Sequence, residues 1–205
     1  MDISKATLSR LPQYLRILKK LQKEENVENI SSTTIAEILK LNSIQVRKDL
    51  ALVSHEEGRP GIGFKVEELI TDLEEVLGLK KVTDAILVGA GRLGQALLNY
   101  SGFEGNFNIV MAFDNDYSKI DGKTILNIKN IKDKIAGKNI KIGIITVQKN
   151  VAQSVCDTLV EAGIKAIWNF APVNLIVPDD VIVKNEDLSA SLMILSKKLH
   201  ERNLD

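Results

Sequence analysis

The residues best placed to do chemistry form a short glycine motif, which reads Gly89-Ala90-Gly91-Arg92-Leu93-Gly94. In motifs of this spacing the first glycine permits a sharp turn, the second lets the main chain approach a pyrophosphate, and the third allows a helix to pack closely on a strand. An apolar stretch at 84–88 leads into the motif, and a helix-forming stretch follows it. Because a helix that begins there directs free N–H groups toward an anion, the pattern predicts a phosphate cradle.

An acidic residue, Asp114, ends the next apolar stretch at 107–113. A carboxylate in that place accepts hydrogen bonds from the adenosine ribose hydroxyls and repels a 2′-phosphate. The order of strand, motif, helix, strand and acid therefore favours NAD(H) over NADP(H) as the cofactor. The alternative is a tight glycine turn followed by an ordinary polar strand end.

The histidines offer no obvious catalyst. The chain has two of them, His55 and His200, and neither follows a strand of the predicted nucleotide-binding domain, where a proton donor to a substrate would lie. We therefore predict no catalytic residue and no metal ligands, and we expect a protein that binds its cofactor without turning it over. Two alternatives remain: a small NAD-dependent oxidoreductase with a helical appendage, and a coenzyme A-binding module whose N-terminal helices bind protein.

The elements around the motif alternate in type. From Val82 onward, apolar stretches alternate with helix-forming ones, which is typical of a parallel sheet covered by helices. We expect strands at 84–88, 107–113, 141–147 and 164–170, helices at 91–101, 130–136 and 150–162, two extended pieces at 173–177 and 181–183, and a last helix at 188–202. The fold class is therefore α/β with a Rossmann-type parallel-sheet domain, in which the single cysteine, Cys156, is a buried core thiol.

Residues 1–80 have a different, mostly helical pattern. A capping pattern at Thr34–Glu37 opens one short helix, and a turn at 41–43 leads to another at 44–53. Two short helices joined by a tight turn predict a helix-turn-helix, in which Arg47 and Lys48 point away from the apolar stripe. The glycine-rich segment 58–66 predicts a tight hairpin, so the N-terminal domain is expected to be a winged helix.

Charge and composition bound the remaining possibilities. The chain of 205 residues has no net charge, but its first 23 residues carry six basic side chains against one acidic one. Local basicity is what contact with DNA requires, although a solvated lysine-rich helix face is the alternative. The single cysteine, the lack of an apolar run long enough to span a membrane and the lack of a secretory leader predict a cytoplasmic location.

Several stretches also carry a resemblance to a known family: SKATLSRLPQYLRILKKL at 4–21, QVRKDL at 45–50, GIGF at 61–64, GAGRLGQALLNY at 89–100, FDND at 113–116, NFAPV at 169–173 and DLS at 187–189. In this order they make the chain similar to the Rex family of redox-sensing repressors over nearly its whole length. The resemblance implies a winged-helix DNA-binding domain at 1–80, a Rossmann NAD(H)-binding domain at 81–186 and a C-terminal helix at 187–205 that swaps across a homodimer. A last helix that packs on its own domain is the alternative.

The resemblance implies a function and roles for individual residues. A repressor of this family would bind palindromic double-stranded operator DNA with NAD⁺ or no ligand, would be released by NADH, and would have no membrane or metal partner. DNA would contact Ser43, Gln45, Arg47, Lys48, Arg59, Gly61, Gly63 and Lys65. The adenosine and pyrophosphate would be held by Gly89 to Gly94 and Asp114, and the nicotinamide half would lie near Tyr100, Thr146, Val147, Asn169, Phe170, Ala171 and Pro172. A ligand-dependent relay would consist of Arg16, Tyr100 and Asp187.

Two stretches depart from the family pattern. Gln148 follows Thr146-Val147 where a proline is usual, which bears on the backbone of the nicotinamide loop. Residues 51–54 replace an aromatic stretch that is usual after the recognition helix, which bears on wing placement and on operator preference.

Overall fold

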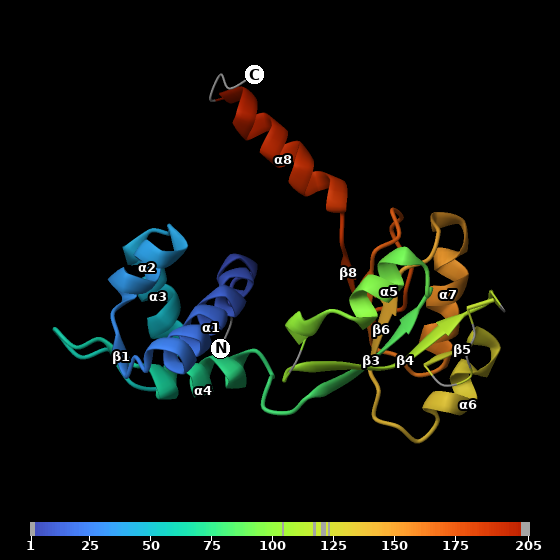
Figure 1. Ribbon diagram of the computed structural model, residues 1–205, viewed down its shortest axis with the longest axis horizontal. Coiled ribbons are helices and arrows are strands. Elements are labelled where there is room, and N and C mark those ends of the chain that lie inside the picture. The colour runs from blue at the N-terminus through green and yellow to red at the C-terminus, as the bar shows by residue number, and fades with distance from the viewer. Residues whose placement is uncertain (1–2, 104, 117, 120–121, 123, 202–205) are drawn as a thin grey trace. The chain divides into compact units, whose positions relative to one another are not determined.

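The computed structural model of the chain describes residues 3–103, 105–116, 118–119, 122 and 124–201 (Figure 1). The chain divides into two compact units, Met1–Lys81 and Val82–Asp205. The first unit is helical with a small sheet, and the second contains a six-stranded sheet with helices on both faces.

Four helices make up most of the first unit: α1 (Lys5–Glu25), α2 (Ser32–Leu39), α3 (Ser43–Val53) and α4 (Val66–Val76). The α1 helix starts after Ser4, whose side chain accepts a hydrogen bond from the Thr7 N–H, and its C-cap Asn26 adopts a left-handed conformation. Pro12 lies inside α1, where it removes one main-chain donor. Apolar side chains from all four helices pack into one core, including Leu11, Leu18, Ile35, Val46, Leu50, Leu69 and Leu73.

The helix-turn-helix begins earlier than the sequence pattern predicted. Ser31, rather than Thr34, caps α2, because the Ser31 side chain accepts a hydrogen bond from the Thr34 N–H. Asn42 caps α3 in the same way through the Ile44 and Gln45 N–H groups. The predicted second helix therefore keeps its place, and the first gains a turn at its start.

The wing is only partly a local hairpin. Arg59 and Gly63 exchange two main-chain hydrogen bonds of 2.8 Å across a tight turn. The residues that follow, β2 (Phe64–Lys65), pair antiparallel with β1 (Asn29–Ile30), which the sequence pattern did not predict. A Cβ at Gly63 would lie 2.2 Å from the Ile30 carbonyl oxygen, so this close pairing requires glycine there.

The sheet of the second unit has the strand order β5-β4-β3-β6-β7-β8, and every pair is parallel. Its strands are β3 (Thr83–Val88), β4 (Phe107–Asp114), β5 (Ile125–Asn127), β6 (Ile142–Ile145), β7 (Ala166–Asn169) and β8 (Ile182–Asn185). The strand order reverses between β3 and β6, and ligands of such sheets bind at the carboxyl ends of the strands at this point. The sequence pattern missed β5, and 173–177, predicted as extended, forms no named strand.

Helices cover both faces of this sheet (Figure 1). On one face α6 (Ile131–Ile135) and α7 (Lys149–Glu161) pack on Ile86, Val88 and Ile145, and on the other α5 (Arg92–Leu98) packs on Ala85 and Leu87. Strands buried on both faces are typical of parallel sheets. Cys156 is fully buried in the first of these cores, as predicted, and burial raises the pKa of its thiol to about 11.

The last helix, α8 (Leu188–Glu201), contributes no residue to these cores. None of its residues, all of which the structure describes, is buried. Its large apolar side chains are exposed, among them Leu192, Leu195 and Leu199. Asp187 caps its start by accepting hydrogen bonds from the Ser189 and Ala190 N–H groups.

Candidate functional site

The three motif glycines have different surroundings. Gly89 has a φ of +105°, and a Cβ there would lie 2.8 Å from the Thr146 main chain. A Cβ at Gly94 would lie 2.0 Å from the Gly89 carbonyl oxygen, so helix α5 can pack against this turn only with glycine. At Gly91 a Cβ would meet no described atom within 4 Å, and no described side chain caps α5 there. The turn is closed on two sides and open at Gly91, which suits a phosphate cradle.

A cleft of about 620 Å³ adjoins this turn. Such a volume lies within the range of about 300–1,000 Å³ that small-molecule sites occupy. The cleft brings together some of the residues predicted to bind the cofactor, namely Gly89, Gly91, Asp114, Thr146 and Val147, and Gln148 borders it as well. The remaining predicted residues lie outside its lining: Ala90, Arg92, Leu93, Gly94, Tyr100, Asn169, Phe170, Ala171 and Pro172.

Asp114 lines this cleft and is only 6% exposed. Its Oδ2 accepts hydrogen bonds from the Ala90 N–H at 2.7 Å and from Lys119 Nζ at 3.3 Å. Its Oδ1 accepts one from the Asp116 N–H at 2.9 Å. The carboxylate thus ties the end of β4 to the glycine turn, and any ribose hydroxyl bound there would share its lone pairs with Lys119.

The side chain of Asn169 forms its hydrogen bonds within the chain. The residue is fully buried, and its Nδ2 lies within 3.1 Å of the Ala171 and Val173 carbonyl oxygens and of Asn185 Oδ1. Its Oδ1 accepts a hydrogen bond from the Ala171 N–H. Both ends of the amide are therefore engaged within the chain, where they shape the loop that carries Phe170.

Phe170 and Tyr100 belong to one row of aromatic rings. Phe170 packs on Trp168 with ring centroids 4.6 Å apart, and Phe103 lies between Trp168 and Tyr100. Tyr100 is 54% exposed, and Asp187 follows β8. Arg16, the third residue of the predicted relay, is exposed on α1 of the first unit.

The residues predicted to contact DNA gather on α3 and on the turn that follows it. Ser43, Gln45, Arg47 and Lys48 are all exposed on α3. A groove of about 520 Å³ is lined by Arg47 of α3, by Arg59, Gly61 and Gly63 of the turn, and by Ser31 at the start of α2. Lys65 lies outside this groove and pairs with Glu68 at 2.6 Å.

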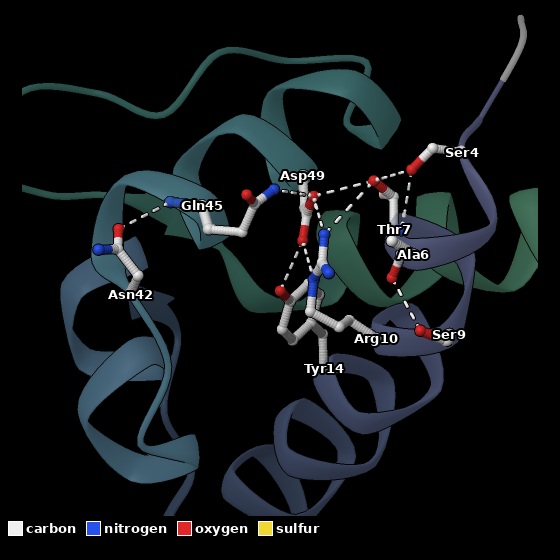
Figure 2. Close-up of polar contacts among 9 residues, drawn as sticks. All are labelled: Ser4, Ala6, Thr7, Ser9, Arg10, Tyr14, Asn42, Gln45 and Asp49. Atoms are coloured by element: carbon white, nitrogen blue, oxygen red, sulfur yellow. Dashed lines mark hydrogen bonds and ion pairs between the residues drawn. The ribbon is translucent and has the colours of Figure 1, made fainter.

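A buried carboxylate on α3 was missed in the sequence. Asp49 is 2% exposed and accepts hydrogen bonds from several side chains, as Figure 2 shows: Thr7 Oγ1 at 3.2 Å, Arg10 Nε at 2.7 Å and Nη2 at 2.9 Å, Tyr14 OH at 2.7 Å and Gln45 Nε2 at 2.9 Å. A signal for it existed, because Asp49 falls on the buried stripe of α3 beside Val46, Leu50 and Val53.

Asp49 remains ionised although it is buried. Burial alone would raise its pKa, but the hydrogen bonds from Arg10, Tyr14 and Gln45 outweigh that effect and lower the pKa to about 2. Burial and the hydrogen bond to Asp49 raise the pKa of Tyr14 to about 12. The ionised carboxylate therefore holds α3 to α1.

Comparison with known proteins links both regions to one family. Residues 2–51 match the family described as "Putative DNA-binding protein N-terminus", and residues 80–173 match "CoA binding domain". The redox-sensing transcriptional repressor Rex of Thermoanaerobacter sp. (strain X514) is 43% identical over 98% of this chain and 92% of its own length. That of Syntrophomonas wolfei is 44% identical over 95% of this chain and 94% of its own length. The chain belongs to the Rex family.

Solved structures of the Rex family agree with this fold. The Rex-family repressor RSP in complex with beta-NAD⁺ and operator DNA has a TM-score of 0.87 and 42% identity, covering 100% of this chain and 95% of that one. RSP in complex with beta-NADH has a TM-score of 0.84 at the same identity, covering 100% of this chain and 97% of that one. The predicted fold class, a DNA-binding domain followed by a Rossmann-like domain, is confirmed.

Membership of the Rex family also decides between the alternatives. The Rex relatives are named transcriptional repressors, so the prediction of a regulator rather than an enzyme is confirmed, and both the oxidoreductase and the coenzyme A module are disfavoured. Within the described residues, no group of three or more His, Cys, Asp and Glu side chains gathers as a metal site. No helix in that part of the chain has the length and apolar character needed to cross a bilayer.

Proposed function

We propose that this chain is a redox-sensing repressor. It binds palindromic double-stranded operator DNA with NAD⁺ or no ligand, and NADH releases it. The observation that carries the proposal is the presence, in one chain, of an exposed Arg47 on a rigidly held recognition helix and of a glycine cradle joined to Asp114. The proposal is supported by the solved structures of RSP, one in complex with beta-NAD⁺ and operator DNA and one in complex with beta-NADH.

On the DNA side, the recognition helix α3 enters the major groove. Arg47 and Lys48 reach base edges and phosphates there, and Ser43 and Gln45 lie at the helix start, where helices of this kind contact bases. The turn from Arg59 to Lys65 approaches the minor groove. A two-fold symmetric protein then requires two half-sites about one helical turn apart, or a small multiple of it.

On the nucleotide side, the cradle and Asp114 hold the adenosine and pyrophosphate of either oxidation state. Bound NAD(H) supplies a nicotinamide ring that is positively charged when oxidised and neutral when reduced. Phe170, Ala171 and Pro172 offer this ring apolar surroundings, and burying an unpaired charge among apolar groups is costly. The loop that Asn169 shapes therefore discriminates in favour of NADH. Thr146 and Val147 border the cleft beside the glycine turn.

The working form is a cytoplasmic homodimer with three functional segments. Residues 1–80 bind DNA, 81–186 bind NAD(H), and the C-terminal segment 187–205, which includes α8 and ends outside the described residues, swaps onto the partner. The exposed apolar side chains of α8 support this exchange, because a monomer rarely leaves such a row open to water. Arg16, Tyr100 and Asp187 form the relay that reports the nucleotide state to the DNA-binding domain, since NADH can release DNA only by binding the two dimer arrangements with different affinities.

The test is a titration of labelled palindromic DNA with the full-length protein, followed by saturating NAD⁺ or NADH. We expect NADH to dissociate the complex and NAD⁺ to leave it intact. Phe170→Ala should reduce the preference for NADH while both nucleotides still bind. Asp114→Asn is the matched contrast, because it should weaken both nucleotides alike. Equal retention of DNA with either oxidation state would overturn the proposed function.

A further inference from the structure

The side chain of Gln45 is held in an unusual direction. Gln45 follows the cap Asn42 by three residues, and its side chain is exposed at the start of α3. A glutamine in this position of a capping box reaches back toward the N–H of the cap. Here Gln45 Nε2 instead donates to Asp49 Oδ1 at 2.9 Å, one turn further along α3 (Figure 2).

This contact settles which end of the amide faces which way. An ionised carboxylate only accepts hydrogen bonds, so the NH₂ group of Gln45 must face Asp49. The carbonyl oxygen of Gln45 and its second amide hydrogen stay on the exposed side of the helix. The side chain therefore presents one acceptor and one donor in a defined arrangement.

Asp49 is in turn held in place from α1. Arg10 contacts both of its oxygens, at 2.7 and 2.9 Å, and Tyr14 OH donates to Oδ2 at 2.7 Å. Tyr14 is fully buried and Asp49 is nearly so, which leaves this carboxylate little freedom to turn. The direction of an exposed amide is thus set by a buried cluster on a neighbouring helix.

We infer that Asp49 is a specificity-determining positioning residue, which orients Gln45 so that the glutamine carbonyl oxygen and its remaining N–H read one base edge of the operator. The inference rests on the proposed function, because it requires α3 to enter the major groove. An acceptor and a donor side by side complement N6 and N7 of adenine. The base pair that Gln45 reads is therefore A·T, once in each half-site.

The experiment measures operator preference with full-length protein and a set of duplexes in which each base pair of the half-site is varied symmetrically. Gln45→Ala should remove the preference for A·T at one position, a loss of about 5- to 150-fold in discrimination per half-site. Asp49→Asn should remove the preference at the same position, because an asparagine can donate as well as accept and lets the Gln45 amide turn over. The double variant should lose no more than either single variant there.

Tyr14→Phe is the matched control. It removes one hydrogen bond to Asp49 without altering the contact with Gln45, so it should lower the melting temperature and leave the base preference unchanged. If the role of Asp49 is purely structural, Asp49→Asn and Tyr14→Phe should each weaken binding to every duplex in proportion to their loss of stability, and neither should change the base preference.

A second measurement uses only the wild-type protein, so it does not depend on whether a variant folds. In the free wild-type protein, NMR relaxation of the Gln45 Nε2 group should show a side chain as ordered as the backbone of α3, because the contact with Asp49 restricts its rotamers. An Nε2 group as mobile as that of an unrestrained surface glutamine would overturn the inference, as would retention by Asp49→Asn of a preference that Gln45→Ala has lost. If Gln45→Ala alters no preference, the inference also fails, whereas the response of the same protein to NADH decides the proposed function separately.

Discussion

Two buried aspartates, one in each unit, show how the same side chain serves two purposes. Asp49 and Asp114 are 2% and 6% exposed, and each accepts several hydrogen bonds. The partners of Asp49 are side chains of α1 and α3, of which Tyr14 is fully buried, Arg10 is partly buried and Gln45 is exposed. The partners of Asp114 are two main-chain N–H groups and Lys119, whose side chain is 38% exposed.

This difference separates a residue that positions an element from one that is available to a ligand. Asp49 and two of its donors, Thr7 and Tyr14, are buried, so removing either side of these contacts would leave a buried polar group unpaired. Asp114 borders an open cleft, where a lysine can give way to a ribose hydroxyl at little cost. The following predictions test this contrast, from the largest expected effect to the smallest.

Asp49→Ala should have the largest effect on stability. It leaves the Arg10 guanidinium and the Tyr14 hydroxyl without their acceptor, and breaking a buried ion pair from one side costs about 3–5 kcal/mol. Chemical denaturation monitored by circular dichroism measures the loss. A loss of less than about 1 kcal/mol in the free energy of unfolding would show that the hydrogen bonds to Asp49 contribute little to stability.

Asp114→Ala should act mainly on nucleotide binding. Loss of a charged acceptor for the ribose is expected to weaken NAD⁺ and NADH together, by roughly 10- to 100-fold, since hydrogen bonds to charged groups contribute about 1.5–3 kcal/mol. Fluorescence titration with NADH, and competition with NAD⁺, gives both affinities. Asp114→Asn is the control, because it keeps an acceptor for the Ala90 N–H and so separates loss of the charge from distortion of the glycine turn. If Asp114→Ala lost as much stability as Asp49→Ala, the two aspartates would not differ in the way described, one positioning an element and the other available to a ligand.

The low pKa of Asp49 predicts a specific loss of stability in acid. Its folded-state pKa of about 2 lies below its ordinary value of 3.8, so the stabilisation is present above pH 4 and is lost as the pH falls through the folded-state pKa. The shift corresponds to roughly 2 kcal/mol. Urea unfolding of wild type and Asp49→Asn should show a difference between them that shrinks from pH 4 to pH 2. A difference that is independent of pH would exclude this linkage.

Lys119→Ala should have the smallest effect. Its ion pair with Asp114 is partly exposed to solvent, and such pairs contribute about 0–1 kcal/mol. NADH should bind as well as to wild type, or up to a few-fold more tightly, because a competitor for the carboxylate is gone. Arg10→Ala, the equivalent change at the other aspartate, should cost several times more stability. Similar losses for the two variants would remove the distinction between the two sites.

The parts of the fold that could be predicted are those specified by local pattern. The glycine spacing and the acid at 114 indicated the cradle, and the structure places Gly89, Gly91 and Asp114 around one cleft. The period of apolar residues located α3, α7 and the long strands β3 and β4 to within a few residues. These signals are strong because each element buries a regular face of its own.

The parts that were missed depend on partners far away in the chain. Strand β1 has two residues, and only its pairing with β2 makes it a strand. β5 has three residues and pairs with β4, so its pattern is too short to stand out. Arg10 and Tyr14 lie 39 and 35 positions from Asp49, and nothing in the local sequence of α1 shows that they meet it.

By itself, the sequence determined that a helical N-terminal unit precedes a nucleotide-binding domain, and it pointed to the glycines and the acid that line one cleft there. Local periodicity and spacing are sufficient for that, because they follow from the geometry of single helices, strands and turns. Only the tertiary structure decided that Asp49 is buried against α1, that Gln45 turns toward it, and that Asn169 shapes its loop from within. Those outcomes depend on which donors packing brings to each buried polar group, and no short stretch of sequence contains that information.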